Sequence, residues 1–261
     1  MERHFIEVHD IGKQYGSGET VVQAVSFMDF FIDDGEFLSV MGQSGSGKST
    51  LLSIIGGLNR PTKGTVYVDT LDIYGLSSEQ KADFRSEYLG IIFQSFQLVP
   101  YLTVLENVKL PMAITGIRSG DQKARALKIL ERVGLGDKVN RLPDQLSGGE
   151  QERVAIARAI VNDPPILLAD EPTGNLDSET AEDIMGLLKS LNEEGKTVIM
   201  VTHNSDMCHY SGRTIFMKDG RMDGSRPSGW AHLQQGFIPP SAQHTVTPSA
   251  RRQPKFSKPP I

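Results

Sequence analysis

The sequence has little of what marks an exported or membrane-spanning protein. Its 261 residues include one cysteine, Cys208, so no disulfide can form within the chain, as is typical of a reducing compartment. The best apolar runs, such as 166–169 and 198–201, have the length of a strand, and none approaches the roughly 18 residues of a membrane helix. No apolar stretch follows the first four residues, so we expect no signal peptide and no membrane crossing by this chain itself.

Neither sign of charge is in large excess. Lysine and arginine number 27 against 32 aspartate and glutamate residues, which gives a net charge of −5 at pH 7. This mildly acidic balance lacks the basic footprint of a nucleic-acid-binding protein, so we expect no nucleic-acid partner. Hydrophobic residues at 38% and charged residues at 23% are typical of a folded globular chain and exclude a wholly disordered one.

The end of the chain differs in composition from the rest. Residues 225–261 contain no Asp or Glu, five basic residues and seven of the 14 prolines. Frequent proline and few apolar residues favour a disordered, Pro-rich basic tail. A solvated tail is the simpler interpretation, and weak contact with an acidic membrane surface or partner is the alternative. We therefore expect one folded domain over residues 1–224.

Strand and helix patterns alternate through this domain. Buried strands are expected in the apolar runs at 37–41, 88–93, 165–169 and 197–202. Apolar spacing predicts one helix that Asp121 caps and Gly134 ends, and another that follows Ser178 and ends at Gly195. This alternation predicts an α/β fold with a mostly parallel sheet covered on both faces. Residues from about 97 to 160 carry only helical patterns, so we expect them to form an inserted α-helical subdomain.

A phosphate-binding loop is the strongest single motif. Residues 42–49 match G-x-x-x-x-G-K-[ST] between an apolar strand and an expected helix. Glycines let backbone N–H groups point at phosphates, and the helix N-terminus adds positive potential. The lysine can reach the β and γ phosphates, and the serine hydroxyl after it can hold Mg²⁺. The expected nucleotide-binding residues of this segment are Gly42, Gln43, Ser44, Gly45, Ser46, Gly47, Lys48, Ser49 and Thr50.

Two carboxylates follow the apolar strand expected at 165–169. Asp170 ends this strand, where the water shell of Mg²⁺ needs an anchor beside a phosphate loop. Glu171 comes next and can act as general base, or orient the attacking water. Taken alone, an Asp-Glu pair is more often a solvated strand end, and the phosphate loop reverses that preference.

A second glycine-rich segment begins another expected helix. Ser147 and Glu150 have the spacing of a capping box, with Gly148 and Gly149 between them. Free N–H groups and paired glycines at a helix start form a second phosphate-sized concavity. The two glycine sites lie about 100 residues apart on different subdomains. One nucleotide could use both sites only if they came from two chains facing head to tail.

Six motifs now stand in one order over roughly residues 4–224. They are the loop 42–49, Phe93-Gln94-Ser95, the segment 146–150, Asp170-Glu171, the segment 174–177 and Thr202-His203. The set resembles the nucleotide-binding subunit of an ATP-binding cassette (ABC) transporter. The resemblance implies a P-loop NTPase core of the ABC ATPase type, a mixed sheet flanked by helices, with the helical subdomain inserted. It also implies ATP as substrate, Mg²⁺ as metal and hydrolysis of ATP as the activity.

The resemblance gives roles to four further residues. Tyr15 matches the aromatic residue that stacks on adenine. Gln94 matches the residue that touches Mg²⁺ or the attacking water, and His203 matches the switch histidine that contacts the γ-phosphate, so both join Glu171 as catalytic residues. Asp177 matches the loop that contacts the partner across the dimer. Taken alone, these would be a core tyrosine, a solvated glutamine, a hydrogen-bonded histidine and the neighbour of a helix N-cap.

The implied partners are a second copy of this chain and an integral membrane permease, at the cytoplasmic face of the inner membrane. The apolar segment 98–105 follows Gln94 and is a candidate contact for that permease, with subdomain core as the alternative. Three positions depart from the common family pattern: Gln43 for proline, Glu152 for glutamine and Asn204 for aspartate. The first two leave the glycine motifs intact, and Asn204 removes a charge beside the switch histidine.

Segments 15–19, 56–64, 106–111 and 171–177 resemble the branch of the family that contains lipoprotein-releasing and macrolide-efflux ATPases. The cell-division ATPase that signals to wall hydrolases belongs to the same branch and is the alternative. ABC ATPases without a transport role are less favoured, because they usually carry two cassettes or a coiled-coil insertion in one chain, and this sequence has neither.

Overall fold

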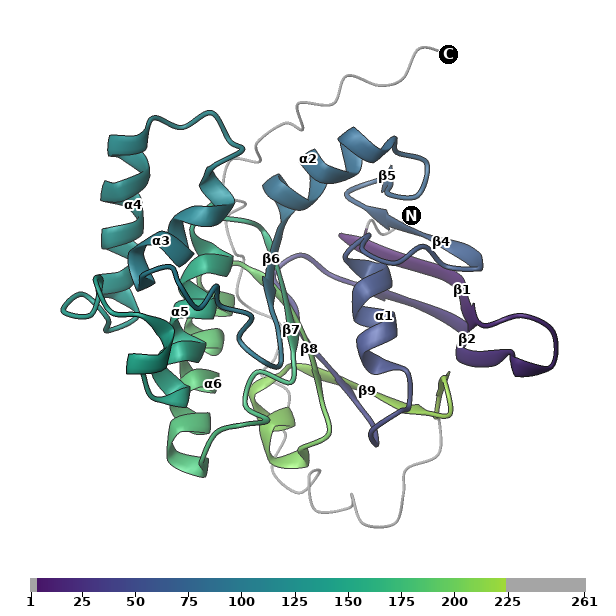
Figure 1. Ribbon diagram of the computed structural model, residues 1–261. Helices are drawn as coiled ribbons and strands as arrows, with labels where there is room; N and C mark the ends of the chain where they lie inside the picture. Colours follow the sequence, from purple (N-terminus) through teal and green to yellow (C-terminus); the bar gives the residue numbers. More distant parts are fainter. Residues whose placement is uncertain (1–3, 224–261) are drawn as a thin grey trace, which may run out of the picture. The chain divides into compact units, whose positions relative to one another are not determined.

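A six-stranded, mostly parallel sheet contains the strands that the apolar runs predict (Figure 1). The computed structural model describes residues 4–223, so the expected tail at 225–261 lies outside the described residues. β9 and β10 pair antiparallel and the other neighbours pair parallel, which confirms a mixed sheet. The strand order is β10 (Arg221–Met222), β9 (Arg213–Lys218), β3 (Phe37–Met41), β8 (Thr197–Thr202), β7 (Ile166–Asp170) and β6 (Leu89–Ile92).

Both faces of this sheet are covered. Side chains alternate between the faces along each strand, so neighbouring residues of a strand pack in different cores. Leu168 packs in a core with α1 (Lys48–Ile55) and a second sheet. Its neighbour Leu167 packs in a separate core with α5 (Gly148–Ile160) and α6 (Ser178–Glu193). The two faces of the sheet therefore bury two distinct apolar clusters.

The sequence patterns did not predict the second sheet, which is antiparallel. Its register shifts near Asp10 and Phe27, whose φ angles are 47° and 52°. Such bulges interrupt the alternation of apolar and polar residues, so the strands carry a weak sequence signal. The strand order is β2 (Val22–Ile32), β1 (Ile6–Tyr15), β4 (Lys63–Val68) and β5 (Leu71–Asp72), with the short η1 (Gly18–Thr20) between β1 and β2.

Between β6 and β7 the described chain forms helices and no strand. These helices bury their own apolar cluster, which includes Val108, Leu130 and Val154. They are α3 (Val104–Lys109), η2 (Leu110–Met112), α4 (Ser119–Arg132), η3 (Pro143–Gln145) and α5. Two further helices, α2 (Ser78–Tyr88) and η4 (Ser205–Tyr210), precede β6 and follow β8.

The expected cap of α4 at Asp121 is wrong. The helix begins at Ser119 after Arg118, and Asp121 lies in its first turn. A carboxylate in the first turn still complements the helix dipole, which is why the pattern placed it near the start. Gly134, with φ of 77°, follows the end of α4 as expected.

Parallel pairing brings four chain segments to one edge of the six-stranded sheet. β3 leads there into the glycine loop, β6 leads to Gln94, β7 ends at Asp170 and β8 leads to His203. The carboxyl ends of parallel strands are the usual place for a ligand site in an α/β sheet. Among the described residues, no helix combines the length and the apolar character that crossing a bilayer requires.

Candidate functional site

The loop between β3 and α1 has a backbone that glycine adopts most readily. Gly45 and Gly47 have φ angles of 80° and 95°, and a Cβ atom on Gly47 would lie 2.1 Å from the Ala24 carbonyl oxygen. The loop leads directly into α1, whose first N–H groups have no partner within the helix. The Ser46 hydroxyl oxygen is buried without a hydrogen-bond partner among the described residues. The loop therefore has the shape and the polar capacity to bind phosphate groups.

Lys48 brings a buried positive charge to this loop. Its side chain is 4% exposed, and its ammonium group donates to the carbonyl oxygens of Gly42 at 2.8 Å and Gln43 at 2.9 Å. The nitrogen also lies 3.9 Å from Glu171 Oε1. Burial lowers the pKa of Lys48, and the carboxylates of Glu171 and Asp170 oppose that shift. A nucleotide phosphate would add negative charge beside this ammonium and hold it in the charged form.

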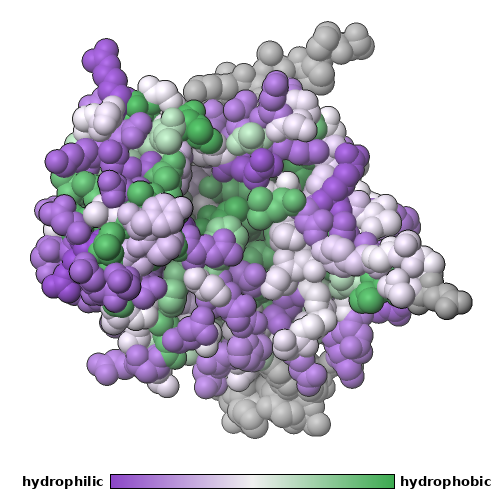
Figure 2. Space-filling model, viewed as in Figure 1, coloured by the Kyte–Doolittle hydropathy of each residue, from purple (hydrophilic) through white to green (hydrophobic). Residues whose placement is uncertain are grey.

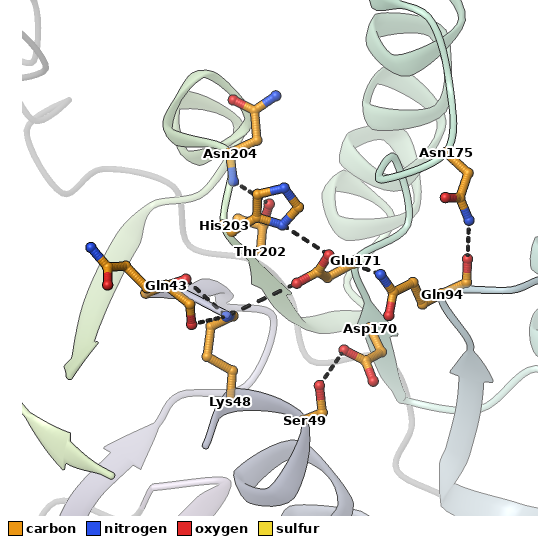
Figure 3. A network of polar contacts seen from close by, with 11 residues as sticks. Gln43, Lys48, Ser49, Gln94, Asp170, Glu171, Asn175, Thr202, His203 and Asn204 are labelled. Atoms are coloured by element: carbon orange, nitrogen blue, oxygen red, sulfur yellow. Dashed lines mark hydrogen bonds and ion pairs between the residues drawn. The ribbon is translucent and has the colours of Figure 1, made fainter. Parts of the chain in front are cut away.

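The first turn of α1 meets the end of β7 through a hydroxyl and a carboxylate. Ser49 Oγ donates to Asp170 Oδ1 at 2.9 Å (Figure 3). Burial raises the pKa of Asp170, and the hydrogen bond from Ser49 opposes that rise. Both groups offer the hard oxygen ligands that Mg²⁺ prefers. Among the described residues, no three His, Cys, Asp or Glu side chains cluster as a metal cage. This donor set therefore fits a Mg²⁺ that takes its other ligands from phosphate oxygens and water.

Glu171 lies at the centre of the polar network. Its Oε2 accepts a hydrogen bond from Gln94 Nε2 at 3.1 Å and lies 2.8 Å from His203 Nδ1 (Figure 3). The φ angle of Glu171 is 48°, an uncommon conformation that tends to occur at functional sites. Two hydrogen bonds hold it there, from its own N–H to Val201 O and from Gly174 N to its carbonyl oxygen. Side chains that follow β6 and β8 thus orient the Glu171 carboxylate, which follows β7.

The turn after Gln94 depends on two residues whose roles the motifs did not predict. Arg158 on α5 donates through both guanidinium nitrogens to the carbonyl oxygens of Phe96 at 2.7 Å and Gln97 at 2.6 Å. Asn175 Nδ2 donates to the carbonyl oxygen of Gln94 at 3.0 Å. These contacts span 61 to 81 residues of sequence, so no local pattern could predict them. Asn175 does lie inside the motif at 174–177, which marked its position without its partner.

The second glycine segment is built as a helix start. Ser147 Oγ accepts from Glu150 N, and Glu150 Oε2 accepts from Ser147 N, which confirms the expected capping box of α5. Glu150 also forms an ion pair with Lys138. A Cβ atom on Gly149 would lie 2.3 Å from Thr180 Cγ2, so this helix start packs tightly against α6.

Asp177 and the capping box are not joined to the network around Glu171. Asp177 is itself the N-cap of α6, and its side chain accepts from Thr180 N at 3.0 Å. Within the part of the chain that the structure describes, no hydrogen bond or ion pair connects Ser147 or Asp177 with Lys48. Within the described residues, the two glycine motifs therefore belong to two separate sets of polar contacts.

Tyr15 is the last residue of β1. Its side chain is 43% exposed, which leaves ring surface open to a ligand. The Lys13 ammonium lies 4.9 Å from the ring centroid, and Asn59 Nδ2 donates to the phenol oxygen. The ring is therefore oriented by neighbours and remains accessible, as stacking on a base requires.

Two of the three departures from the family pattern have local explanations, and the third, Glu152, has none in the structure. Gln43 contributes its backbone carbonyl to Lys48 while its side chain is exposed, so the side chain is free to vary. Asn204 caps η4 and accepts from Asp206 N at 2.9 Å, a role that asparagine and aspartate fill equally well. Glu152 is 1% exposed in α5, and its Oε1 has no hydrogen-bond partner among the described residues.

Comparison with known proteins identifies the family. The sequence pattern of the family described as "ABC transporter" matches residues 25–174. This chain belongs to the ABC transporter family. It has the ABC cassette fold and is an ABC ATPase of the ATP-binding subunit type.

Relatives of this ABC ATPase include cassettes of nearly the same length. An uncharacterised ABC transporter ATP-binding protein of Thermotoga maritima is 46% identical over 224 residues, which cover 86% of this chain and 96% of that protein. The protein MJ0796 of Methanocaldococcus jannaschii is 48% identical over 223 residues, covering 84% and 95%. A macrolide export ATP-binding/permease protein, MacB of Chlorobium phaeobacteroides, is 47% identical over 215 residues, covering 82% of this chain and 33% of MacB.

Solved cassettes share the fold of this ABC ATPase. The dimeric structure of MJ0796 matches with a TM-score of 0.78 and 46% identity, covering 84% of this chain and 96% of that chain. A second dimeric structure of MJ0796, in a post-hydrolysis state with ADP and phosphate, matches with a TM-score of 0.78 and 45% identity over the same shares. The resemblance to the branch with MacB-like ATPases is thereby confirmed.

Proposed function

We propose that this chain works as a head-to-tail homodimer that binds each ATP between two copies and drives a separate membrane permease. One observation carries the proposal. The Lys48–Glu171 network and the capping box at Ser147 are two anion sites without a contact between them among the described residues. A second copy turned head to tail would bring one site of each chain onto the same nucleotide. The dimeric cassettes among the solved relatives support this arrangement.

In each composite site, one copy would hold the phosphates from the loop side. Residues 42–50 would bind the phosphate chain, with Lys48 neutralising its β and γ groups. Ser49, Gln94 and, through water, Asp170 would hold Mg²⁺, which offsets phosphate charge when bound there. Tyr15 would stack on adenine. The other copy would add the helix start at residues 147–150 and the loop at Asp177.

Hydrolysis would then depend on the network around Glu171. The oxygen of a water molecule forms a bond to the γ-phosphorus while the bond from that phosphorus to the β–γ bridging oxygen breaks, and Glu171 accepts the proton of the water. Gln94 fixes the carboxylate through its amide, His203 lies 2.8 Å from the same oxygen, and His203 would contact the γ-phosphate. Closure on ATP and opening after hydrolysis would supply the mechanical stroke.

A hollow beside the network offers a surface for the permease. Figure 2 shows apolar side chains inside a hollow on the face that Figure 1 presents. The described residues also form a cleft next to Ser49 and Asp170, and its apolar lining includes Leu52, Leu58, Ile91, Phe93 and Leu168. Apolar walls that open to solvent are typical of a protein contact.

The candidate segment 98–105 divides between core and surface. Val104 is 1% exposed and belongs to the apolar cluster of the helical segment. Tyr101 is 80% exposed and Leu102 is half-buried. We assign the permease contact to Tyr101 and Leu102 together with the hollow, at the cytoplasmic face of the inner membrane.

We infer that the coupled process is efflux or lipoprotein release by mechanotransmission. The relative named as a macrolide export protein supports the efflux alternative, because its ATP-binding third matches most of this chain. A signalling ATPase of the cell-division type remains the second candidate, favoured by the same branch motifs.

Two measurements test the proposal. Steady-state ATP hydrolysis should fall about 100-fold or more in Glu171→Gln, because the general base is lost. A photo-cross-linker at position 102 should capture an integral membrane protein with several spans, identified by mass, and a cross-linker at the exposed Glu182 should not. Unchanged hydrolysis would overturn the role of Glu171. Co-purification with ribosomes or DNA and no membrane protein would overturn the transport role.

A further inference from the structure

Gln94 is held at two points, and a different residue holds each. Its side-chain amide donates to Glu171 Oε2 at 3.1 Å, and its main-chain carbonyl accepts from Asn175 Nδ2 at 3.0 Å (Figure 3). Asn175 touches neither Lys48 nor Glu171 through a hydrogen bond of its side chain among the described residues. Its contact with the reaction site therefore runs through Gln94.

The backbone around Gln94 needs such support. Phe96 and Gln97 follow Gln94 and have φ angles of 58° and 47°. Residues other than glycine adopt this backbone conformation at a cost in free energy. Arg158 holds the carbonyl oxygens of these two residues from α5. Among the described residues, Arg158 makes no hydrogen bond to the Gln94 carbonyl, and the side-chain donor to that carbonyl is Asn175.

Asn175 is well placed to hold a fixed position. Its loop is tightened by hydrogen bonds from Gly174 N to Glu171 O at 3.0 Å and from Leu176 N to Thr173 O at 3.2 Å. Thr173 is 8% exposed, and the loop ends at the N-cap of α6. The side chain of Asn175 thus extends from a rigid turn that begins at Glu171 itself.

These contacts close a ring. The chain runs from Glu171 along the loop to Asn175, crosses to the Gln94 carbonyl and returns through the Gln94 amide to the Glu171 carboxylate. We propose that Asn175 is a positioning residue that sets Gln94 against Glu171, so that the general base keeps the direction needed for attack by water. This inference rests on the proposed roles of Glu171 and Gln94 and adds the residue that aligns them.

Steady-state ATP hydrolysis by Asn175→Ala and Asn175→Asp tests the inference. The first variant removes the amide. The second keeps its shape and replaces the donor with an oxygen that repels the Gln94 carbonyl. We expect kcat to fall about five- to tenfold in both, because one hydrogen bond that orients a catalytic group is lost. KM for ATP should stay within twofold, because Asn175 binds no phosphate. The exposed Asn140→Ala, on the helical segment, is the matched control and should keep the full rate.

A double-mutant cycle with Gln94→Ala separates positioning from a general structural effect. If Asn175 acts through Gln94, adding Asn175→Ala to Gln94→Ala should cause no further fall in kcat. Losses that multiply in the double variant, or a kcat within twofold of the parent in both Asn175 variants, would overturn the inference. Should Asn175→Ala melt at a lower temperature, Asn175→Asp decides, since it conserves the volume.

The same series distinguishes failure of this inference from failure of the proposed function. If Glu171→Gln and Gln94→Ala lose activity while the Asn175 variants keep it, the positioning role alone is wrong. If Glu171→Gln keeps the parent rate, the proposed catalytic network is wrong, and the positioning role falls with it.

Discussion

Ser49 Oγ donates to Asp170 Oδ1 at 2.9 Å across 121 residues of sequence. This one hydrogen bond joins the first turn of α1 to the end of β7, and so joins the phosphate loop to the carboxylate pair. It also brings two oxygen ligands of the kind that Mg²⁺ prefers to the same point. The arrangement supports the proposal that Ser49 and Asp170 hold Mg²⁺ together.

The first prediction concerns this pair. Ser49→Ala should raise the Mg²⁺ concentration that gives half of the maximal ATPase rate about tenfold. The hydroxyl ligand is lost, and Asp170 loses its orienting hydrogen bond. A Mg²⁺ titration of the ATPase rate measures the shift. Ser119→Ala, the same chemical change at an exposed position of α4, should leave the titration midpoint in place. Equal midpoints in the two variants would contradict the assignment.

The second prediction separates capping from nucleotide binding at Ser147. Ser147→Ala and Ser77→Ala each remove a capping box, in α5 and α2, and each should cost about 1 kcal/mol of unfolding free energy. Only Ser147→Ala should raise the ATP concentration needed for dimerisation, because only that helix start is proposed to face ATP. Denaturant unfolding and sedimentation velocity measure the two effects. Parallel behaviour of the variants in both assays would reduce Ser147 to a cap.

The third prediction follows from the buried acid in α5. Burial raises the pKa of Glu152 from an ordinary value of 4.5 to about 8, and the positive charge of Arg158 opposes the shift. Between these two values the folded chain keeps a proton that the unfolded chain releases. The unfolding free energy should therefore fall as pH rises through this window, by at most about 1.4 kcal/mol per pH unit, and level off above it.

Glu152→Gln removes this group and keeps its shape. The stability gain of the variant over the parent should be small near pH 5 and should grow up to about pH 8. Denaturant titrations at several pH values measure it, with the exposed Glu182→Gln on α6 as control. A gain that is independent of pH would show that the Glu152 carboxyl does not keep its proton in the folded chain.

The fourth prediction concerns the loop proposed to meet the permease. Asn107 is 0% exposed, and its side chain makes four hydrogen bonds to the backbone of Val99, Leu102 and Thr103. Asn107→Ala would leave Val99 N and Leu102 O unpaired, because the carbonyls of Val99 and Thr103 also accept from backbone N–H groups. The loss of these hydrogen bonds should cost about 3 kcal/mol of unfolding free energy. Amide exchange within 99–103 should accelerate as well. If exchange there stayed as slow as in the exposed Asn140→Ala, another contact must order the loop.

Much of the six-stranded sheet could be predicted from the sequence. The runs at 37–41 and 197–202 match β3 and β8 residue for residue, because strands buried on both faces are apolar throughout. The antiparallel sheet escaped prediction, since bulges at Asp10 and Phe27 break its alternation. Helix α2 also escaped prediction. Phe84 is its one buried residue, so the helix has no repeated apolar spacing.

The candidate site was likewise predicted in part from the sequence. Ordered motifs predicted Lys48, Asp170 and Glu171, because each motif is local in sequence and carries its own chemistry. Asn175 and Arg158 act through contacts that exist only after distant segments have folded together. Residues that hold a catalytic loop in place make such contacts with backbone carbonyls, which every residue has, so no side-chain pattern marks the partner.

In the proposed dimer, one ATP uses Lys48 of one copy and Ser147 of the other. Two chains, each carrying Glu171→Gln to block turnover, test it most directly. One adds Lys48→Ala and the other adds Ser147→Arg. Neither chain alone contains an intact composite site, but a mixture contains one. We predict that sedimentation velocity with ATP detects dimers in the mixture and monomers in each separate sample. A mixture that stays monomeric, while the Glu171→Gln parent dimerises with ATP, would show that the two residues do not share a nucleotide.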